Sequence, residues 1–120
     1  VGTGLMLSRC LEAAEALAAE GIDARVIEVH TIKPFDSETI VSAARETGAL
    51  VTAEEHSIIG GLGGAVIEAL AAVRPVPVER VGIADRFGTT GPYDELLALL
   101  GLAVSDIVSA AHRAVHLKRD

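Results

Sequence analysis

Short apolar segments alternate with longer amphipathic segments along the chain, and each change of pattern predicts a change of secondary structure. A first helix is predicted over residues 8–20, because apolar positions recur there at helical spacing and Gly21 follows as a stop signal. The positions expected to form its buried face are Leu7, Leu11, Ala14 and Leu17.

Short apolar segments predict strands over residues 25–29, 49–53 and 78–83, and residues 1–4 are interpreted as the end of a further strand followed by a tight turn. Further helices are predicted over residues 37–47, from the glycine-rich turn at 60–64 to about residue 73, and over residues 93–100 and 105–116. Asp36 or Ser37 is expected to cap the second helix, with Gly48 at its end, and Ser105 to cap the last. The alternation of strand and helix predicts a parallel sheet with right-handed crossovers, covered on both faces.

Composition and charge exclude several classes of protein. Half of the 120 residues are hydrophobic and the formal net charge is −7, with no basic run, so neither a nucleic acid nor an anionic membrane surface is an expected partner. No apolar run is expected to reach the roughly 18 residues that span a bilayer, so a cytoplasmic location is predicted. The single Cys10 excludes an internal disulfide. Because the chain begins with Val1, we expect it to be either a piece of a longer polypeptide or a processed chain.

The glycine-containing loops recur after predicted strands, at the edge where open parallel sheets bind ligands or partners. A dinucleotide fingerprint needs G-x-G-x-x-G after a strand, and the chain has only two broken matches. These are Gly2 and Gly4 with Leu7 in the third place, and Gly61 and Gly63 with Val66 in the third place. The glycines are therefore expected to permit tight turns and close backbone packing rather than nucleotide binding.

The most polar strand end is the sequence Glu54-Glu55-His56-Ser57. A carboxylate beside a histidine is suited to acid–base work or to orienting a substrate. Because side chains alternate along a strand, however, Glu54 and Glu55 should point to opposite faces. His56 is expected either to contact a substrate or cofactor, or to serve loop structure or a subunit contact.

Other chemistry has weaker signals. The nucleophile elbow G-x-S-x-G and the metal motif H-E-x-x-H are absent from the sequence. His112 and His116 lie four residues apart, which is more typical of a solvated helix face than of a metal site. In the irregular stretch 85–92, Arg86 is a candidate for an anion or partner contact and Phe87 for an anchor in a neighbouring subunit. The alternative is a loop that simply closes the sheet edge.

Three of these loops together resemble the transketolase C-terminal domain family. They are T-I-K-P-F-D at residues 31–36, V-T-A-E-E-H-S-I-I-G-G-L-G-G-A-V at 51–66, and R-F-G-T-T-G-P at 86–92. The Glu-Glu-His-Ser and Phe-Gly-x-x-Gly-Pro forms are most similar to the C-terminal part of a split bacterial transketolase. Alternatives within the family are a 1-deoxyxylulose-5-phosphate synthase and a 2-oxo acid dehydrogenase beta subunit. A non-catalytic interaction module and a small nucleotide-binding domain are alternatives outside it.

The resemblance implies one Rossmann-like domain over residues 1–120, a three-layer α/β/α sandwich with four parallel strands in the spatial order second, first, third, fourth. It also implies a parent enzyme that transfers a two-carbon ketol unit between sugar phosphates with thiamine diphosphate and Mg²⁺. In this family the cofactor is held by the pyrimidine-binding and diphosphate-binding domains, so no catalytic, cofactor-binding or metal-binding residue is assigned here. The isolated domain is expected to be inactive.

The resemblance assigns this domain a part in subunit assembly, with the other two domains as partners and a homo-oligomer as the expected state. The family places an extra antiparallel edge strand before residue 1, and because the given sequence does not contain it, we expect an exposed sheet edge that pairs with another chain. The candidate residues for an interface or active-site edge are Glu54, Glu55, His56, Gly60, Gly61, Gly63, Gly64, Arg86 and Phe87.

Overall fold

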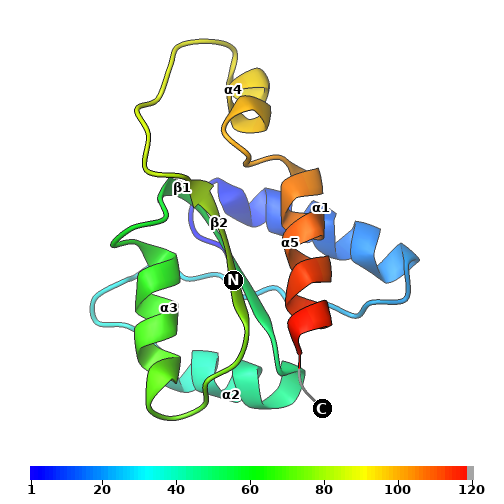
Figure 1. Ribbon diagram of the computed structural model, residues 1–120, viewed down its shortest axis with the longest axis vertical. Coiled ribbons are helices and arrows are strands. Elements are labelled where there is room, and N and C mark those ends of the chain that lie inside the picture. The colour runs from blue at the N-terminus through cyan, green and yellow to red at the C-terminus, as the bar shows by residue number, and fades with distance from the viewer. Residues whose placement is uncertain (119–120) are drawn as a thin grey trace.

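Two parallel strands form the centre of the fold in a computed structural model, which describes residues 1–118 (Figure 1). β1 (Leu50–Ser57) pairs with β2 (Val78–Ile83) from Leu50↔Val78 to Ala53↔Val81. An irregularity follows, and the pairing resumes at Ser57↔Ile83. Both strands therefore end at the same edge of the sheet, and the polar strand end lies there.

The first two predicted strands join this sheet through isolated parallel bridges, two at Gly2 and one at Glu28. Gly2 bridges Glu28 on one side and Ala53 on the other. The N–H of Gly2 donates to the carbonyl oxygen of Ile27 at 2.9 Å, and the N–H of Ala53 donates to that of Val1 at 2.8 Å. The spatial order is therefore second, first, third, fourth, as expected. Within residues 1–118 only β1 and β2 are continuous strands, because the first segment turns into a helix after a few residues.

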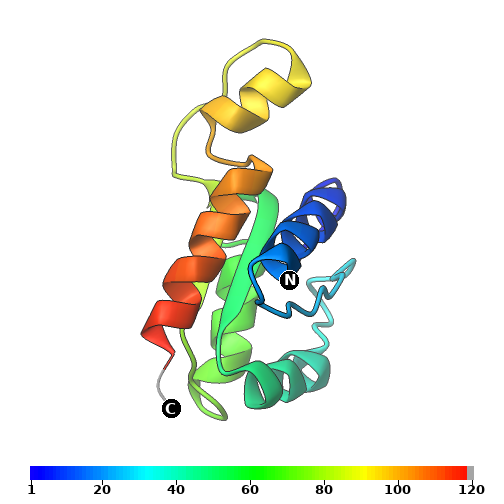
Figure 2. The ribbon, with the colours of Figure 1, turned by 90° about the vertical axis from the view of Figure 1, so that its right-hand side faces the viewer.

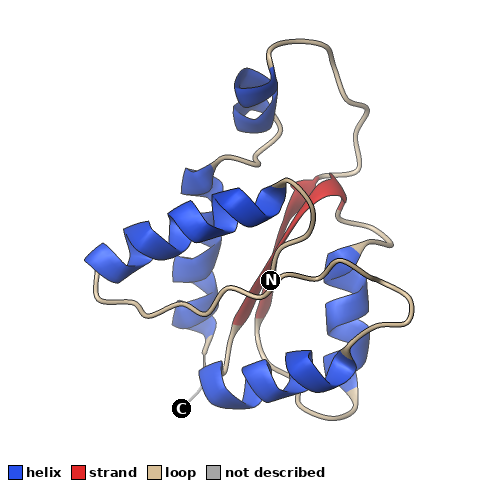
Figure 3. Cartoon of the chain, turned by 180° about the vertical axis from the view of Figure 1, so that it is seen from behind, coloured by secondary structure: helices blue, strands red, loops and turns tan. Residues whose placement is uncertain are grey.

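Within residues 1–118, five helices surround the sheet, and all five were predicted. They are α1 (Met6–Ala19), α2 (Ser37–Thr47), α3 (Leu62–Ala71), α4 (Tyr93–Leu99) and α5 (Val104–Leu117). Figures 1 and 2 show α3 and α5 on opposite sides of the strands. The long connection from α1 to α2 carries the second sheet segment past the N-terminus (Figure 3).

Alternating side chains of β1 divide the interior into two hydrophobic cores. Leu50 packs with α2 and α3 on one face, and Ala53 packs with α1 and α5 on the other. A strand that is buried on both faces requires a helical layer on each, so the predicted three-layer α/β fold with a parallel sheet is confirmed.

The buried face of α1 differs from the predicted one. The structure buries Met6, Cys10, Ala13 and Leu17, so the prediction was correct for Leu17 and wrong for Leu7, Leu11 and Ala14. Leu11 is 52% exposed. The physical reason is the close approach of α1 to the first sheet segment, since a Cβ atom at Gly2 would lie only 2.8 Å from the Sγ atom of Cys10. That contact places the row of residues that begins at Met6 on the buried face of α1.

Helix ends follow local signals at α2 but not at α5. Asp36 caps α2 by accepting the N–H of Thr39 at 3.1 Å, and Gly48 ends the helix with a φ of 75°. The Thr39 hydroxyl and then the Thr39 N–H lower the pKa of Asp36. The predicted cap Ser105 is wrong, because the N-cap position is Ala103, whose N–H donates to Asp106 at 2.9 Å.

One segment of the described residues, Tyr93–Leu117, is long and apolar enough to cross a membrane by length and composition, with a mean hydropathy of 1.5. The sequence expectation of no such run was therefore wrong. In the structure this segment is two helices, α4 and α5, separated by a turn in which Gly101 has a φ of 76°. Leu102 and Ile107 lie in the hydrophobic core, which is typical of a core helix of a globular fold.

Candidate functional site

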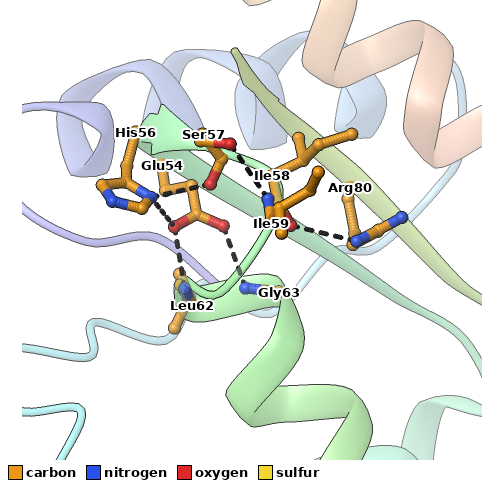
Figure 4. Close-up of polar contacts among 8 residues, drawn as sticks. All are labelled: Glu54, His56, Ser57, Ile58, Ile59, Leu62, Gly63 and Arg80. Atoms are coloured by element: carbon orange, nitrogen blue, oxygen red, sulfur yellow. Dashed lines mark hydrogen bonds and ion pairs between the residues drawn. The ribbon is translucent and has the colours of Figure 1, made fainter. Parts of the chain in front are cut away.

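Glu54 lies at the end of β1 and points inward, against the N-terminus of α3 (Figure 4). Its side-chain carboxylate accepts the backbone N–H of Leu62 at 2.7 Å and that of Gly63 at 3.0 Å. The residue is only 2% exposed. A helix N-terminus carries unsatisfied N–H groups and a partial positive charge, so the carboxylate satisfies α3 from inside the protein.

The glycine-rich turn before α3 is shaped by this carboxylate. A Cβ atom at Gly61 would overlap the Glu54 carboxylate and lie 2.8 Å from Nδ1 of His56. A Cβ atom at Gly63 would lie 2.7 Å from Cδ of Arg80. Gly60 has a φ of +74°, whereas a Cβ atom at Gly64 would meet nothing within 4 Å. The expectation of close backbone packing is thus confirmed at Gly61 and Gly63, and that of a tight turn at Gly60.

His56 is the exposed partner of this cluster, with 59% of its side chain accessible. Its Nδ1–H donates to the main-chain oxygen of Ser57 at 2.7 Å and lies 3.6 Å from the Glu54 carboxylate. This arrangement fixes the ring and leaves Nε2 as the nitrogen available to a partner. Two neighbouring side chains therefore differ sharply in role, since Glu54 is enclosed and His56 faces solvent.

Glu55 belongs to the opposite layer, as strand alternation predicted. It is exposed, and its negative charge acts on Tyr93 of α4. Partial burial first, and then this charge, raise the pKa of the Tyr93 hydroxyl. On the same side, Arg9 of α1 forms an ion pair with Asp94 of α4. The adjacent carboxylates of Glu54 and Glu55 consequently do not form a paired acid–base site.

Residues 84–92, here called the arm, leave the end of β2 and project beyond the sheet (Figure 1). Every residue of the arm is exposed, and Phe87 is 100% exposed. The guanidinium of Arg86 donates to the carbonyl oxygen of Leu99 at 2.7 Å. Within residues 1–118, no hydrogen bond or ion pair joins the arm to the Glu54–His56 cluster, so the candidate residues form two separate groups.

Two residues near the cluster were missed at the sequence level. Arg80 donates to the carbonyl oxygen of Ile58 at 3.0 Å and holds the loop after β1 (Figure 4). Thr52 is fully buried, and its Oγ1 has no hydrogen-bond partner in the described part of the chain. The two residues are brought together by the parallel register, which pairs Thr52 with Arg80 on the face that carries Glu54 and is seen only in the structure.

A hollow of about 610 Å³ lies at the other end of the sheet, between α1, α2 and α5. Its walls include Leu17, Ile22 and Ala43, and none of the nine candidate residues lines it. It is therefore a separate feature from the polar strand end.

Residues 1–118 do not fit thiamine diphosphate with its metal at the N-terminus of α3. The N-terminus of α3, where the fold could bind a diphosphate, is filled by the Glu54 carboxylate. Residues 1–118 contain no group of three or more His, Cys, Asp or Glu side chains that could hold a metal ion. His112, one of two histidines weighed for a metal, instead bonds Glu20, the residue after α1, at 2.6 Å.

Comparison with known proteins matches this geometry to one family. The family model described as the C-terminal domain of transketolase matches residues 1–107. A solved structure titled "Split gene transketolase, inactive beta4 tetramer" superposes with a TM-score of 0.95 and 51% identity, covering 98% of this chain and 39% of that one.

Curated relatives give the same result. A 6-deoxy-6-sulfo-D-fructose transketolase subunit from Clostridium sp. (strain MSTE9) is 49% identical over 118 residues, which cover 98% of this chain and 37% of the relative. A 1-deoxy-D-xylulose-5-phosphate synthase from Geobacter sulfurreducens is 45% identical over 112 residues, 92% of this chain and 18% of the relative. The chain thus spans well under half of the proteins it matches. With its parallel sheet, five helices and three loop motifs, it belongs to the transketolase C-terminal domain family.

Proposed function

We propose that residues 1–120 form the C-terminal domain of a split, transketolase-type enzyme that transfers a two-carbon ketol unit between sugar phosphates. The observation that carries the proposal is the 51% identity over 98% of the chain to a split-gene transketolase, at a TM-score of 0.95. The curated relative at 49% identity is also a transketolase subunit. A 1-deoxyxylulose-5-phosphate synthase is the second candidate, supported by the relative at 45% identity.

In this proposal, thiamine diphosphate and Mg²⁺ belong to the pyrimidine-binding and diphosphate-binding domains of the parent enzyme. The filled N-terminus of α3 supports this division, because a carboxylate already occupies the position of an anionic group. The isolated domain is then without transferase activity, and its cytoplasmic location stays a prediction.

The role of this domain is to dock against those two domains and to assemble the enzyme as a homo-oligomer. Exposed apolar side chains at the carboxyl edge support this role, since Phe87 is fully exposed and Ile59, beside the glycine-rich turn, is 61% exposed. Exposed aromatic residues are enriched in protein interfaces. The solved relative described as a β4 tetramer is consistent with assembly through such a surface.

Calorimetric titration tests whether the cofactor is bound by the other domains and not by this one. The isolated chain should show no saturable heat with thiamine diphosphate and Mg²⁺, whereas the full enzyme with its diphosphate-binding subunit should bind. Saturable micromolar binding to the isolated chain would place a cofactor site in this domain and contradict the proposal.

A substitution tests docking in the full-length subunit. Phe87→Ala should weaken assembly by roughly 5- to 30-fold in sedimentation experiments, as expected for an aromatic interface residue. Val73→Ala is the matched control, because Val73 is 57% exposed but lies beyond α3, at the opposite end of the sheet. Equal effects of the two substitutions would argue against a docking role for the arm.

A further inference from the structure

The Glu54 carboxylate has an unusual environment for a charged group. Glu54 is 2% exposed, and among residues 1–118 the only basic side chain within ion-pair distance is His56, at 3.6 Å. Its other partners are two main-chain N–H groups, those of Leu62 and Gly63. Buried charges are retained only where such partners replace water. The Glu54 carboxylate and the N–H groups of the first turn of α3 therefore satisfy one another's hydrogen bonding.

The surrounding glycines make room for this carboxylate rather than for an external ligand. A side chain at Gly61 would overlap it, and a Cβ atom at Gly82 would lie 3.3 Å from the Cγ atom of Glu54 and 2.9 Å from the Cγ2 atom of Ile58. Helix N-termini that follow glycine-rich turns bind phosphates in many α/β proteins. Here an anion supplied by the neighbouring strand fills the equivalent position.

We propose that Glu54 is a positioning residue, whose carboxylate stands in for an external anion at the N-terminus of α3. It thereby closes the helix to phosphate ligands and fixes the turn at residues 60–64, together with Ile59 and His56 beside it. Insofar as this turn docks against other domains, the inference rests on the proposed function. The proposal that Glu54 takes the place of an external anion does not rest on that function, because it concerns contacts within this chain.

Removal of the carboxylate tests directly whether Glu54 takes the place of an external anion. In ¹⁵N-labelled chain carrying Glu54→Ala, the amide protons of Leu62 and Gly63 should exchange with solvent at least about 10-fold faster, because their acceptor is lost. Sodium formate should restore their protection saturably by supplying a carboxylate. Glu55→Ala is the matched control, since it removes the same side chain one position later, at an exposed site. It should exchange like the wild type and ignore formate.

If Glu54→Ala fails to fold, Glu54→Gln keeps the volume of the side chain but offers one oxygen to two N–H groups. Faster exchange at one of the two amides is then expected. Unchanged protection of both amides in either folded variant, or no response of Glu54→Ala to formate, would overturn the inference. Titration with inorganic phosphate completes the test, since the wild type should show no shift at Leu62 and Gly63, and a saturable shift there would also overturn it.

Docking is measured separately in the full-length subunit. Glu54→Gln should weaken assembly by several-fold, and formate should recover assembly in Glu54→Ala. Normal assembly of a variant with unprotected amides would overturn the positioning role in docking. Failure of the proposed function would appear differently, as an intact formate response in a chain whose assembly is insensitive to Phe87→Ala.

Discussion

The guanidinium of Arg86 donates a 2.7 Å hydrogen bond to the main-chain carbonyl oxygen of Leu99, across the base of the arm. Leu99 is the last residue of α4, where carbonyl groups lack partners within the helix and favour a cation. The preceding residue, Asp85, has a φ of 46°, a conformation that Asp tolerates better than most residues. This bond therefore joins the start of the arm to the helix at its end.

Replacement of Arg86 by Ala should loosen the arm with little effect elsewhere. Loss of one hydrogen bond from a charged, exposed side chain is expected to lower the free energy of unfolding by about 1 kcal/mol. Hydrogen exchange of peptides covering residues 84–92 should accelerate, while peptides from α2 should not change. Arg74→Ala, at another exposed arginine, is the control. Equal exchange of the arm in both variants would show that Arg86 does not order it.

Alanine substitutions at two glycines of the same turn should have opposite effects. Gly61→Ala places a Cβ atom against the Glu54 carboxylate, so a loss of roughly 3 kcal/mol or more is expected. Gly64 lies inside α3 with open space around its Cα, and Gly64→Ala should add about 0.5–1 kcal/mol. Chemical denaturation of the two variants measures both changes. Similar stability of the two proteins would contradict the close packing at Gly61.

Thr52→Val should stabilise the protein. The Thr52 hydroxyl is fully buried without a hydrogen-bond partner in the described structure, and valine has nearly the same shape. Relief of an unsatisfied buried hydroxyl is expected to raise the free energy of unfolding by about 1 kcal/mol. Thr47→Val should have the opposite sign, because the Thr47 hydroxyl bonds the carbonyl oxygens of Ala43 and Ala49. Urea titration of both variants decides the comparison.

Cys10 should react slowly with thiol reagents in the folded chain. It is 7% exposed, and burial raises the pKa of its thiol. At pH 8 its rate with a disulfide reagent should be at least about 100-fold below that of the urea-unfolded chain, since reaction requires opening. A rate close to that of unfolded chain would disprove the burial.

The same shift gives a sign for the pH dependence of stability. Because the folded thiol holds its proton more tightly, the unfolded chain ionises first as the pH rises above the ordinary thiol value of 9.0. The contribution of Cys10 to stability is therefore present below pH 9 and is lost as the pH rises toward the folded pKa. Cys10→Ala should reduce the alkaline loss of stability in this range.

Local signals in the sequence were sufficient for much of the fold. The bounds of α2 were predicted correctly, because Asp36 and Gly48 act on the residues next to them. The order of the sheet segments also agreed with the expectation, although it came from family resemblance rather than from the residues themselves.

The errors arise where contacts between distant segments decide the outcome. The buried row of α1 is set by the close approach of Cys10 to Gly2, which hydrophobic spacing alone did not reveal. Likewise, the chain pattern marked Glu54 as a polar strand end. Its bonds to Leu62 and Gly63 depend on the way the chain reverses after β1. A buried glutamate can be recognised only once its partners are known.

The ladder between β1 and β2 has a mechanical consequence for the two surface loops. The glycine-rich turn continues β1 and the arm continues β2, and these are the two strands with extended pairing. The spacing of the points where the two loops begin is therefore set by main-chain hydrogen bonds, and the Arg80 and Arg86 side chains hold the loops beyond those points. A partner that contacts both loops therefore meets two segments that start from one pair of hydrogen-bonded strands. Deleting one residue from either strand would move its later side chains to the opposite face of the sheet and shift the loop that follows along the ladder.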